Sequence, residues 1–110
     1  MTGWYELSNS SDGQFHFVLK ADDAEILLSS ELYKTKGAAE NGIASMQSSC
    51  QVEKHHEKKE SSNGKFYFNL KAANHQVIGT SRMYATAASR DEGIASAKAN
   101  GVTQTIKDLT

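Results

Sequence analysis

The sequence predicts an α+β fold in which two β-β-β-α-β repeats share one mainly antiparallel sheet of about eight strands, with two helices on one face. The first observation is internal repetition: Gly13 to Cys50 aligns without a gap with Gly64 to Gly101 at an offset of 51, and 13 of 38 columns are identical. The second is a change of apolar period within each copy, from two residues to three and four. Because a repeat of about fifty residues cannot close a core alone, we expect the copies to bury their apolar faces against each other.

The junction between the copies predicts a single domain over residues 1–110, built of tandem repeats at about 1–53 and 54–110. A chain of this length suits one small core. No segment rich in Pro, Gly or Ser separates the copies, and the chain contains no proline. We therefore expect the last strand of the first copy, at residues 51–53, to run straight on into the first strand of the second, at residues 54–60.

Alternating apolar residues predict the strands of each copy. The expected ranges are residues 3–7, 15–20 and 25–29 in the first copy, and 66–71 and 76–81 in the second. Asp12-Gly13 is a strong hairpin signal. Because side chains alternate across a strand, they form two sets on opposite faces. The set expected in the core is Phe15, Phe17, Leu19, Phe66, Phe68 and Leu70. The set on the other face is His16, Val18, Lys20, Tyr67, Asn69 and Lys71.

Helical spacing follows the strands in each copy. Thr35 and Thr86 are candidate N-caps at equivalent positions. Residues at spacings of three and four then form one apolar face per helix. They are Ala39, Ile43, Met46 and Cys50 in the first copy and Ile94 and Ala97 in the second, where Arg90 replaces Ala39. Asn100-Gly101 predicts the end of the second helix, and a last strand is expected over residues 102–106.

Glycine recurs in the middle of both predicted helices, at Gly42 and Gly93. It indicates either a close approach of the helix backbone to the sheet or a tolerated weak spot that costs about 1 kcal/mol relative to alanine. The predicted core joins equivalent positions of the two copies: Phe15/Phe66, Phe17/Phe68, Leu19/Leu70 and Ile43/Ile94.

Composition argues against several classes of protein. The formal net charge of −1 argues against a dominant electrostatic attraction to nucleic acid. Cys50 is the only cysteine, so neither an internal disulfide nor a cysteine cage for a metal is expected. No apolar run approaches the roughly 20 residues of a membrane helix, and the first residues lack the pattern of a signal peptide. These features predict a cytoplasmic protein without a cofactor.

Charge is unevenly distributed along the chain. Residues 1–50 hold three Lys and seven Asp or Glu, whereas residues 51–110 hold nine Lys or Arg and six Asp or Glu. This asymmetry indicates either a simple attraction between the two halves, which salt would screen, or a basic face for an anionic partner.

The repeat motif itself points to a family. Each copy has a G-x-F-x-F-x-L-K-A stretch, an acidic or Asn-containing turn, S-x-x-Y, and a helix with G-I-x-S. The first copy carries it on Gly13, Phe15, Phe17, Leu19, Lys20, Ala21, Ser30, Tyr33, Gly42, Ile43 and Ser45. The second carries it on Gly64, Phe66, Phe68, Leu70, Lys71, Ala72, Asn74, Ser81, Tyr84, Gly93, Ile94 and Ser96. This pattern resembles the small bacterial YegP-like proteins, also described as UPF0339 or DUF1508, a domain of unknown function.

The resemblance implies β-β-β-α-β units used in pairs, with the C-terminal strands exchanged between the repeats. It implies no activity and no catalytic residues. Because both copies lie in one chain, we expect a monomer whose partner, if any, is a protein rather than a nucleic acid or a membrane. Two departures stand out: Asp23-Ala24 and Asn74-His75 replace the usual Asn-Gly, which leaves the turn type open, and His55 and His56 occupy the positions of Trp4 and Tyr5.

The first candidate binding surface is the predicted helix-free face of the sheet. Lys20 and Lys71, with Tyr67 beside them, would give it two positive charges and an aromatic ring. Such faces bind single-stranded nucleic acid by stacking and charge. The alternative is an ordinary solvated strand face, which the net charge of −1 favours.

The second candidate lies where each strand leads into a helix. Tyr33 and Tyr84, with Ser30 and Ser81, could line a small pocket at the pseudo-twofold axis. The favoured interpretation is that each tyrosine closes the end of the core while its hydroxyl reaches the surface.

The remaining titratable residues carry weaker signals. His55 and His56 could bind a metal, but adjacent strand residues point to opposite faces, so no metal site is predicted. Cys50 is expected to be a buried small apolar residue rather than a nucleophile. Asp22-Asp23 and Asp91-Glu92 are carboxylate pairs without a sign that they converge on a pocket.

Three function classes follow from these observations. The sequence favours a non-enzymatic interaction or accessory module whose helix-free sheet face or edge strands meet a partner. The alternatives are single-stranded nucleic-acid binding through Lys20, Lys71 and Tyr67, and a small-ligand-binding protein or enzyme at the Ser/Tyr turns.

Overall fold

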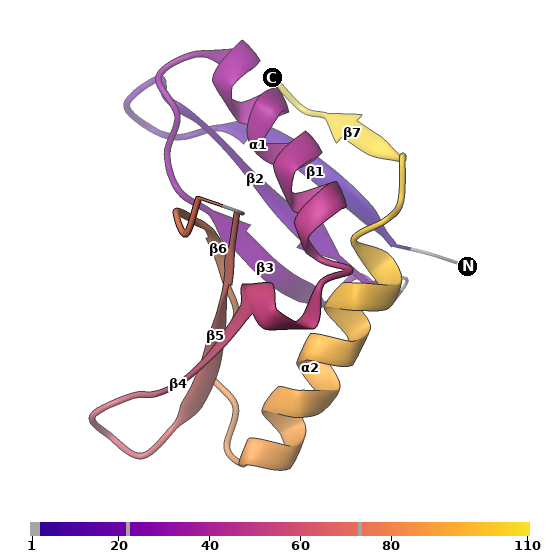
Figure 1. Cartoon of the computed structure of the whole chain (residues 1–110). Helices are drawn as coiled ribbons and strands as arrows, with labels where there is room; N and C mark the ends of the chain where they lie inside the picture. The colour runs from indigo at the N-terminus through magenta and orange to yellow at the C-terminus, as the bar shows by residue number, and fades with distance from the viewer. Residues whose placement is uncertain (1–2, 22, 73) are drawn as a thin grey trace.

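The computed structural model describes residues 3–21, 23–72 and 74–110, which form one mixed sheet of seven strands with two helices packed on it (Figure 1). The first repeat contains β1 (Trp4–Asn9), β2 (Phe15–Lys20), β3 (Ile26–Ser30) and α1 (Lys36–Ser49). The second contains the 3-10 helix η1 (Glu53–His55), β4 (His56–Glu60), β5 (Phe66–Lys71), β6 (Val77–Thr80), α2 (Ala87–Asn100) and β7 (Ile106–Asp108). The predicted α+β class is confirmed.

The two repeats meet edge to edge in the middle of the sheet. The strand order is β4-β5-β6-β3-β2-β1-β7, and all neighbours are antiparallel except β1 and β7. At the centre β3 pairs with β6, with Ser29 opposite Thr80. These two residues are equivalent positions of the repeats, so a pseudo-twofold axis passes between them. Helices α1 and α2 each contact strands of both repeats (Figure 1).

The predicted exchange of C-terminal strands is confirmed. The last strand of the second repeat, β7, pairs in parallel with β1 of the first, with Ile106 opposite Tyr5. The segment that leaves α1 enters the other half of the sheet and becomes β4, which pairs with β5. Because β4 is also the first strand of the second repeat, the described chain forms seven strands rather than the predicted eight or so.

The predicted continuous strand over residues 51–60 is wrong before His56. The peptide N–H groups of Val52 and His55 donate to the carbonyls of Ser49 and Val52, at 3.1 and 3.0 Å. The chain therefore leaves α1 through tight turns and η1 before it becomes extended.

The predicted last strand over residues 102–106 also lies elsewhere. The Thr103 N–H donates to the Asn100 carbonyl at 3.1 Å, so the end of α2 continues as a turn. The chain becomes extended only where Thr105 accepts a hydrogen bond from the N–H of Tyr5 at 3.0 Å. β7 consequently starts at Ile106.

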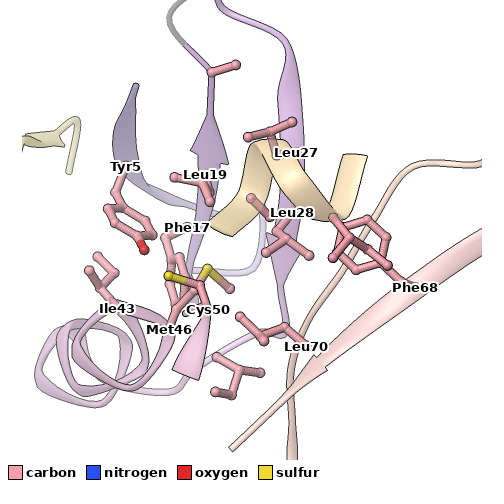
Figure 2. Packing of buried hydrophobic residues seen from close by; sticks show 14 of the residues in the cluster. Tyr5, Phe17, Leu19, Leu27, Leu28, Ile43, Met46, Cys50, Phe68 and Leu70 are labelled. Atoms are coloured by element: carbon pink, nitrogen blue, oxygen red, sulfur yellow. The ribbon is translucent and has the colours of Figure 1, made fainter. Parts of the chain in front are cut away.

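Six of the eight residues in the predicted core pairs are buried between the sheet and the helices (Figure 2). Five of their members are no more than 1% exposed, and Ile94 is 4% exposed. Those five are Phe17, Leu19, Phe68, Leu70 and Ile43. Phe15 and Phe66 are half-buried and pack against the margin of the cluster. One continuous interior therefore contains side chains from both repeats.

Contacts near the pseudo-twofold axis combine large with small residues. A Cβ at Gly101 would overlap the Sγ of Cys50, its equivalent in the other repeat. A Cβ at Gly79 would overlap the end of the Met46 side chain. The equivalents of Gly79 and Met46 are the buried Leu28 and Ala97. The large residue thus lies on the helix in one half and on the strand in the other.

Both helices begin and pack as predicted. The side-chain oxygens of Thr35 and Thr86 accept hydrogen bonds from N–H groups of the first turns, as N-caps do. A Cβ at Gly42 would overlap Tyr33, and a Cβ at Gly93 would overlap Tyr84. Close approach is therefore the correct interpretation of the mid-helix glycines. Each helix approaches the tyrosine that precedes it, and at Gly42 the helix also approaches the ring of Phe17 on β2.

The structure shows the backbone geometry of the β2–β3 and β5–β6 turns, which the sequence left open. In the β2–β3 turn the Ala24 N–H donates to the Ala21 carbonyl at 2.9 Å, and in the β5–β6 turn the His75 N–H donates to the Ala72 carbonyl at 2.9 Å. Four hairpin residues take a positive φ at the same turn position: Gly13 at 82°, Gly64 at 80°, Ala24 at 70° and His75 at 69°. Ala24 and His75 therefore adopt a left-handed conformation that glycine tolerates better.

Replacing Ala24 or His75 with glycine should raise the free energy of unfolding by about 0.5–1 kcal/mol, because the left-handed conformation strains a residue that has a Cβ. We expect a higher urea midpoint with an unchanged slope. Gly64→Ala is the matched control, since its Cβ would meet nothing within 4 Å, and it should lower the midpoint. A lower midpoint for Ala24→Gly would contradict the backbone conformation described above.

Gly93→Ala should lower the free energy of unfolding by about 1–2 kcal/mol, because the overlap with the Tyr84 hydroxyl outweighs the gain in helix propensity. Gly37→Ala, in α1 with open space around it, should be neutral or stabilising. Thermal unfolding of Gly93→Ala in a Tyr84→Phe background tests the cause. The second change should recover part of the loss, and no recovery would argue against the hydroxyl contact.

Candidate functional site

The tyrosines that the sequence singled out are held by the ends of strands. Tyr33 exchanges two backbone hydrogen bonds with Phe15, both 2.7 Å. Tyr84 exchanges two with Phe66, at 2.8 and 2.6 Å. These isolated bridges fix the turn into each helix and direct both rings towards the mid-helix glycines.

Ser30 and Ser81 have a structural role instead. Each hydroxyl accepts a hydrogen bond from a strand N–H at 2.9 Å, that of Phe17 or Phe68. Each then donates to a backbone carbonyl at 2.8 Å, that of Glu31 or Arg82. The serines tie the end of β3 to β2 and the end of β6 to β5, and neither lines a pocket with its tyrosine.

Each tyrosine lines a pocket at an equivalent place in the two halves. The Tyr84 pocket has a volume of about 280 Å³ and is lined by Glu25, Leu27, Arg82, Tyr84, Ser89, Glu92, Gly93 and Ser96. The Tyr33 pocket has a volume of about 210 Å³, and its lining includes the equivalent of every one of those residues. These equivalents are Gln76, Ile78, Glu31, Tyr33, Ala38, Asn41, Gly42 and Ser45.

Both pockets require both repeats. The Tyr84 pocket takes its tyrosine and its helix from the second repeat, and Glu25 and Leu27 from the first. The Tyr33 pocket reverses these contributions, with Gln76 and Ile78 from the second repeat. The β3–β6 pairing therefore builds the two pockets at the same time as it builds the sheet.

The two pockets differ in charge. The Arg82 guanidinium lies 3.3 Å from a carboxylate oxygen of Glu25 and 5.2 Å from the centre of the Tyr84 ring. Glu92 adds a second carboxylate to that lining. In the Tyr33 pocket, Gln76 and Asn41 replace the two glutamates and Glu31 replaces Arg82. Only the Tyr84 pocket therefore combines a cation with carboxylates.

The hydroxyl of Tyr84 is buried and has no hydrogen-bond partner among the described residues, and the residue is only 7% exposed, so the prediction that this hydroxyl reaches the surface is wrong. Burial raises the pKa of Tyr84 above its ordinary value, and the nearby Arg82 opposes this effect. Burial also raises the pKa of Tyr33, to which the Glu31 carboxylate contributes. Both hydroxyls therefore stay protonated at neutral pH and can donate a hydrogen bond.

The charges on the helix-free face are compensated within the protein. Lys20 lies 3.2 Å from Glu6, and Lys71 lies 2.8 Å from Glu57. The two pairs are repeat equivalents, and Lys71 holds the pKa of Glu57 below its ordinary value. Tyr67 is half-buried on β5. Two strands, β3 and β6, separate β2 from β5, so the structure does not gather Lys20 and Lys71 into one positive cluster.

The adjacent histidines lie in different environments. His56 is 6% exposed and packs on the Phe68 ring, with 5.8 Å between the ring centres. His55 ends η1 and is half-buried. No group of three metal-ligating side chains occurs in the part of the chain that the structure describes.

Of the carboxylate pair Asp91-Glu92, Glu92 does line a pocket, that of Tyr84, contrary to the expectation from the sequence, whereas Asp91 and Cys50 do not line it. Cys50 is fully buried, and burial raises the pKa of its thiol, as expected for a packed apolar residue. Asp91 forms ion pairs with Lys58 and Arg90, both at 3.4 Å. Asp22 lies outside the described residues, so the Asp22-Asp23 pair cannot be placed.

The sequence missed the charged lining of the Tyr84 pocket. Glu25 comes from the other repeat, so its position depends on the β3–β6 pairing, which no local pattern indicates. The available signal was the offset of 51: every lining residue of the Tyr84 pocket has its equivalent in the lining of the Tyr33 pocket. Among the described residues, neither helix is long and apolar enough to cross a membrane.

Comparison with known proteins gives a consistent assignment. The sequence model of the domain of unknown function DUF1508 matches residues 10–57 and again residues 61–108. The UPF0339 protein YegP of Escherichia coli is 66% identical over 110 residues, which cover all of both chains. A UPF0339 protein of Shewanella oneidensis is 58% identical, again over the full length of both.

Solved structures agree with the fold. The solution NMR structure of YegP from E. coli, described as a protein of unknown function, superposes with a TM-score of 0.95 at 65% identity and covers 100% of this chain and 95% of that one. The solution NMR structure of the UPF0339 protein from Shewanella oneidensis gives a TM-score of 0.94 at 58% identity, with 100% and 93% covered. The chain therefore belongs to the DUF1508 family of YegP-like UPF0339 proteins and carries two copies of its domain.

Proposed function

We propose that this protein is a non-enzymatic binding module that takes up a small polar molecule in the Tyr84 pocket. The observation that carries the proposal is the buried Tyr84 hydroxyl, which has no hydrogen-bond partner among the described residues and belongs to a pocket that also contains Arg82 and two carboxylates. Buried polar groups are nearly always hydrogen-bonded, so a bound molecule with an acceptor atom would satisfy this donor after a small displacement of the ring.

The lining suggests the chemistry of the ligand. Arg82 would attract a carboxylate, and Glu25 and Glu92 would attract an amine. A volume of about 280 Å³ lies at the lower limit of ligand pockets, which span roughly 300–1,000 Å³. These features favour a zwitterion of amino-acid size. The protonated tyrosine and the Arg82–Glu25 ion pair suit recognition better than catalysis, because neither provides an activated nucleophile or base.

A protein partner on the helix-free face is a second candidate. That face carries an ion pair in each repeat, Lys20–Glu6 and Lys71–Glu57, together with the half-buried rings of Trp4 and Tyr67. Mixed charge with aromatic side chains is common in protein interfaces. Single-stranded nucleic acid would instead favour unpaired positive charge along the strand face.

We also infer that the chain acts as a monomer. Both strands at the pseudo-twofold axis, β3 and β6, come from the same chain, so no second copy is needed to complete the sheet. The edge strand β4 is rich in charge, with Lys58, Lys59 and Glu60 exposed. Charged residues on an edge strand disfavour pairing with another copy.

Ligand binding is testable by thermal-shift screening against amino acids and other small zwitterions. We expect at least one to raise the unfolding temperature, and Tyr84→Phe to weaken its affinity by about tenfold through the lost hydrogen bond. Tyr33→Phe, the matched change in the other pocket, should leave the affinity unchanged. The proposal fails if no zwitterion binds at millimolar concentration, or if the two variants behave alike.

Gel filtration with light scattering at micromolar concentration should give a mass near 12.0 kDa. Residues 1–50 expressed alone should pair with each other or remain unfolded, since they lack half of the shared interior. A dimer of the full-length chain would contradict the inferred monomeric state. A well-ordered monomer formed by residues 1–50 alone would contradict the inference that each repeat needs the other to fold.

A further inference from the structure

We propose that the second repeat contains a binding site for a small oxyanion, a phosphate or carboxylate group, between η1 and the β5–β6 turn. The site is a cavity of about 290 Å³ lined by Lys54, His55, Lys71, Ala72 and His75. It shares no lining residue with the Tyr84 pocket, so it goes beyond the function proposed above.

The cavity arises from a difference between the two repeats. In the first repeat the β1–β2 ladder continues to Trp4 opposite Lys20, and the backbone of Gly3 lies directly against the Lys20 carbonyl. In the second repeat the β4–β5 ladder stops at His56 opposite Leu70, because η1 turns the chain away. The corner that the first repeat fills with its own backbone is therefore open in the second.

Three of the lining residues differ between the repeats, and each of the three has a titratable side chain only in the second repeat. The lining residues Lys54, His55 and His75 stand where the first repeat has Gly3, Trp4 and Ala24. The remaining two, Lys71 and Ala72, are the same residue types as Lys20 and Ala21. Three residues without a titratable group have thus been replaced by one lysine and two histidines, while the strand framework is retained.

The lining suits an anion. Two lysines and two imidazoles offer N–H donors, and no carboxylate is among the five residues that line the cavity. Glu57 pairs with Lys71 at 2.8 Å from outside this lining and fixes that side chain in place. Lys54 is exposed and can turn towards a bound anion.

The two imidazoles complete the donor set. Nδ1 of His55 is buried and has no hydrogen-bond partner among the described residues. His75 is exposed and lies in the β5–β6 turn, which borders the cavity. A divalent cation is disfavoured at this site by the ammonium group of Lys54 and because none of the five lining residues is a carboxylate.

The test is an NMR titration of the ¹⁵N-labelled full chain at low ionic strength with inorganic phosphate, and separately with succinate. We expect saturable amide shifts at Lys54, His55, Lys71 and His75, and none at the equivalent corner of the first repeat. The tighter of the two anions identifies the source of the oxyanion. Sodium chloride at matched ionic strength is the control for screening alone.

Two exposed changes test the residues without threatening the fold. Lys54→Gln combined with His75→Gly should weaken anion binding by about tenfold, because it removes two donors, whereas Ala24→Gly makes the matched backbone change in the first repeat and should have no effect. The proposal is overturned by an unchanged affinity of the double variant, by equal shifts in both repeats, by chloride reproducing the shifts, or by no response to either anion.

Discussion

The pairing of β3 with β6 is the interaction on which the rest of this structure depends. It places the equivalent residues Ser29 and Thr80 opposite each other, and so sets the axis that relates the repeats. The packing beside it accepts no second large residue: Cys50 faces Gly101, and Met46 lies over Gly79. Interiors are close-packed, so a large side chain on one side requires a small one on the other. The two repeats are therefore complementary halves, and exchanging one for a copy of the other would produce overlaps or cavities at the axis.

Much of the fold follows from local patterns, and the exceptions have physical causes. Alternation placed Phe17 and Leu19 in the core correctly, and helical spacing did the same for Ile43 and Met46, because burial of an apolar face dominates those elements. The segment around Val52 was wrongly predicted as a strand because turn hydrogen bonds after α1 compete with extension, and its short sequence has no periodicity that would reveal them. Nothing in the sequence indicated the positive φ of Ala24, because no glycine marks that position. The geometry of the hairpin imposes the left-handed conformation there, although alanine disfavours it.

The candidate site was predictable in part. The offset of 51 pointed to Tyr33 and Tyr84 together, and both line pockets. It could not show that Ser30 and Ser81 serve the backbone, since a hydroxyl in a turn is equally suited to either role. Nor could it reveal Glu25 beside Arg82, which requires strands from one repeat to reach the helix of the other. Lys20 and Lys71 lie on the predicted helix-free face, but their charge is compensated by Glu6 and Glu57, which only the cross-strand register brings close.

Differences between the copies show where chemistry is free to vary. Positions such as Phe17/Phe68 and Gly42/Gly93 hold the same residue in both repeats because each serves the same packing. The lining positions differ in chemistry: Arg82 stands where the other repeat has Glu31, and His75 where it has Ala24. A scaffold with two equivalent corners can keep one closed for stability and open the other for binding, since the shared interior already holds both halves in place. A tandem arrangement in a single chain permits this asymmetry, whereas in a symmetric dimer of one repeat every substitution would occur in both halves.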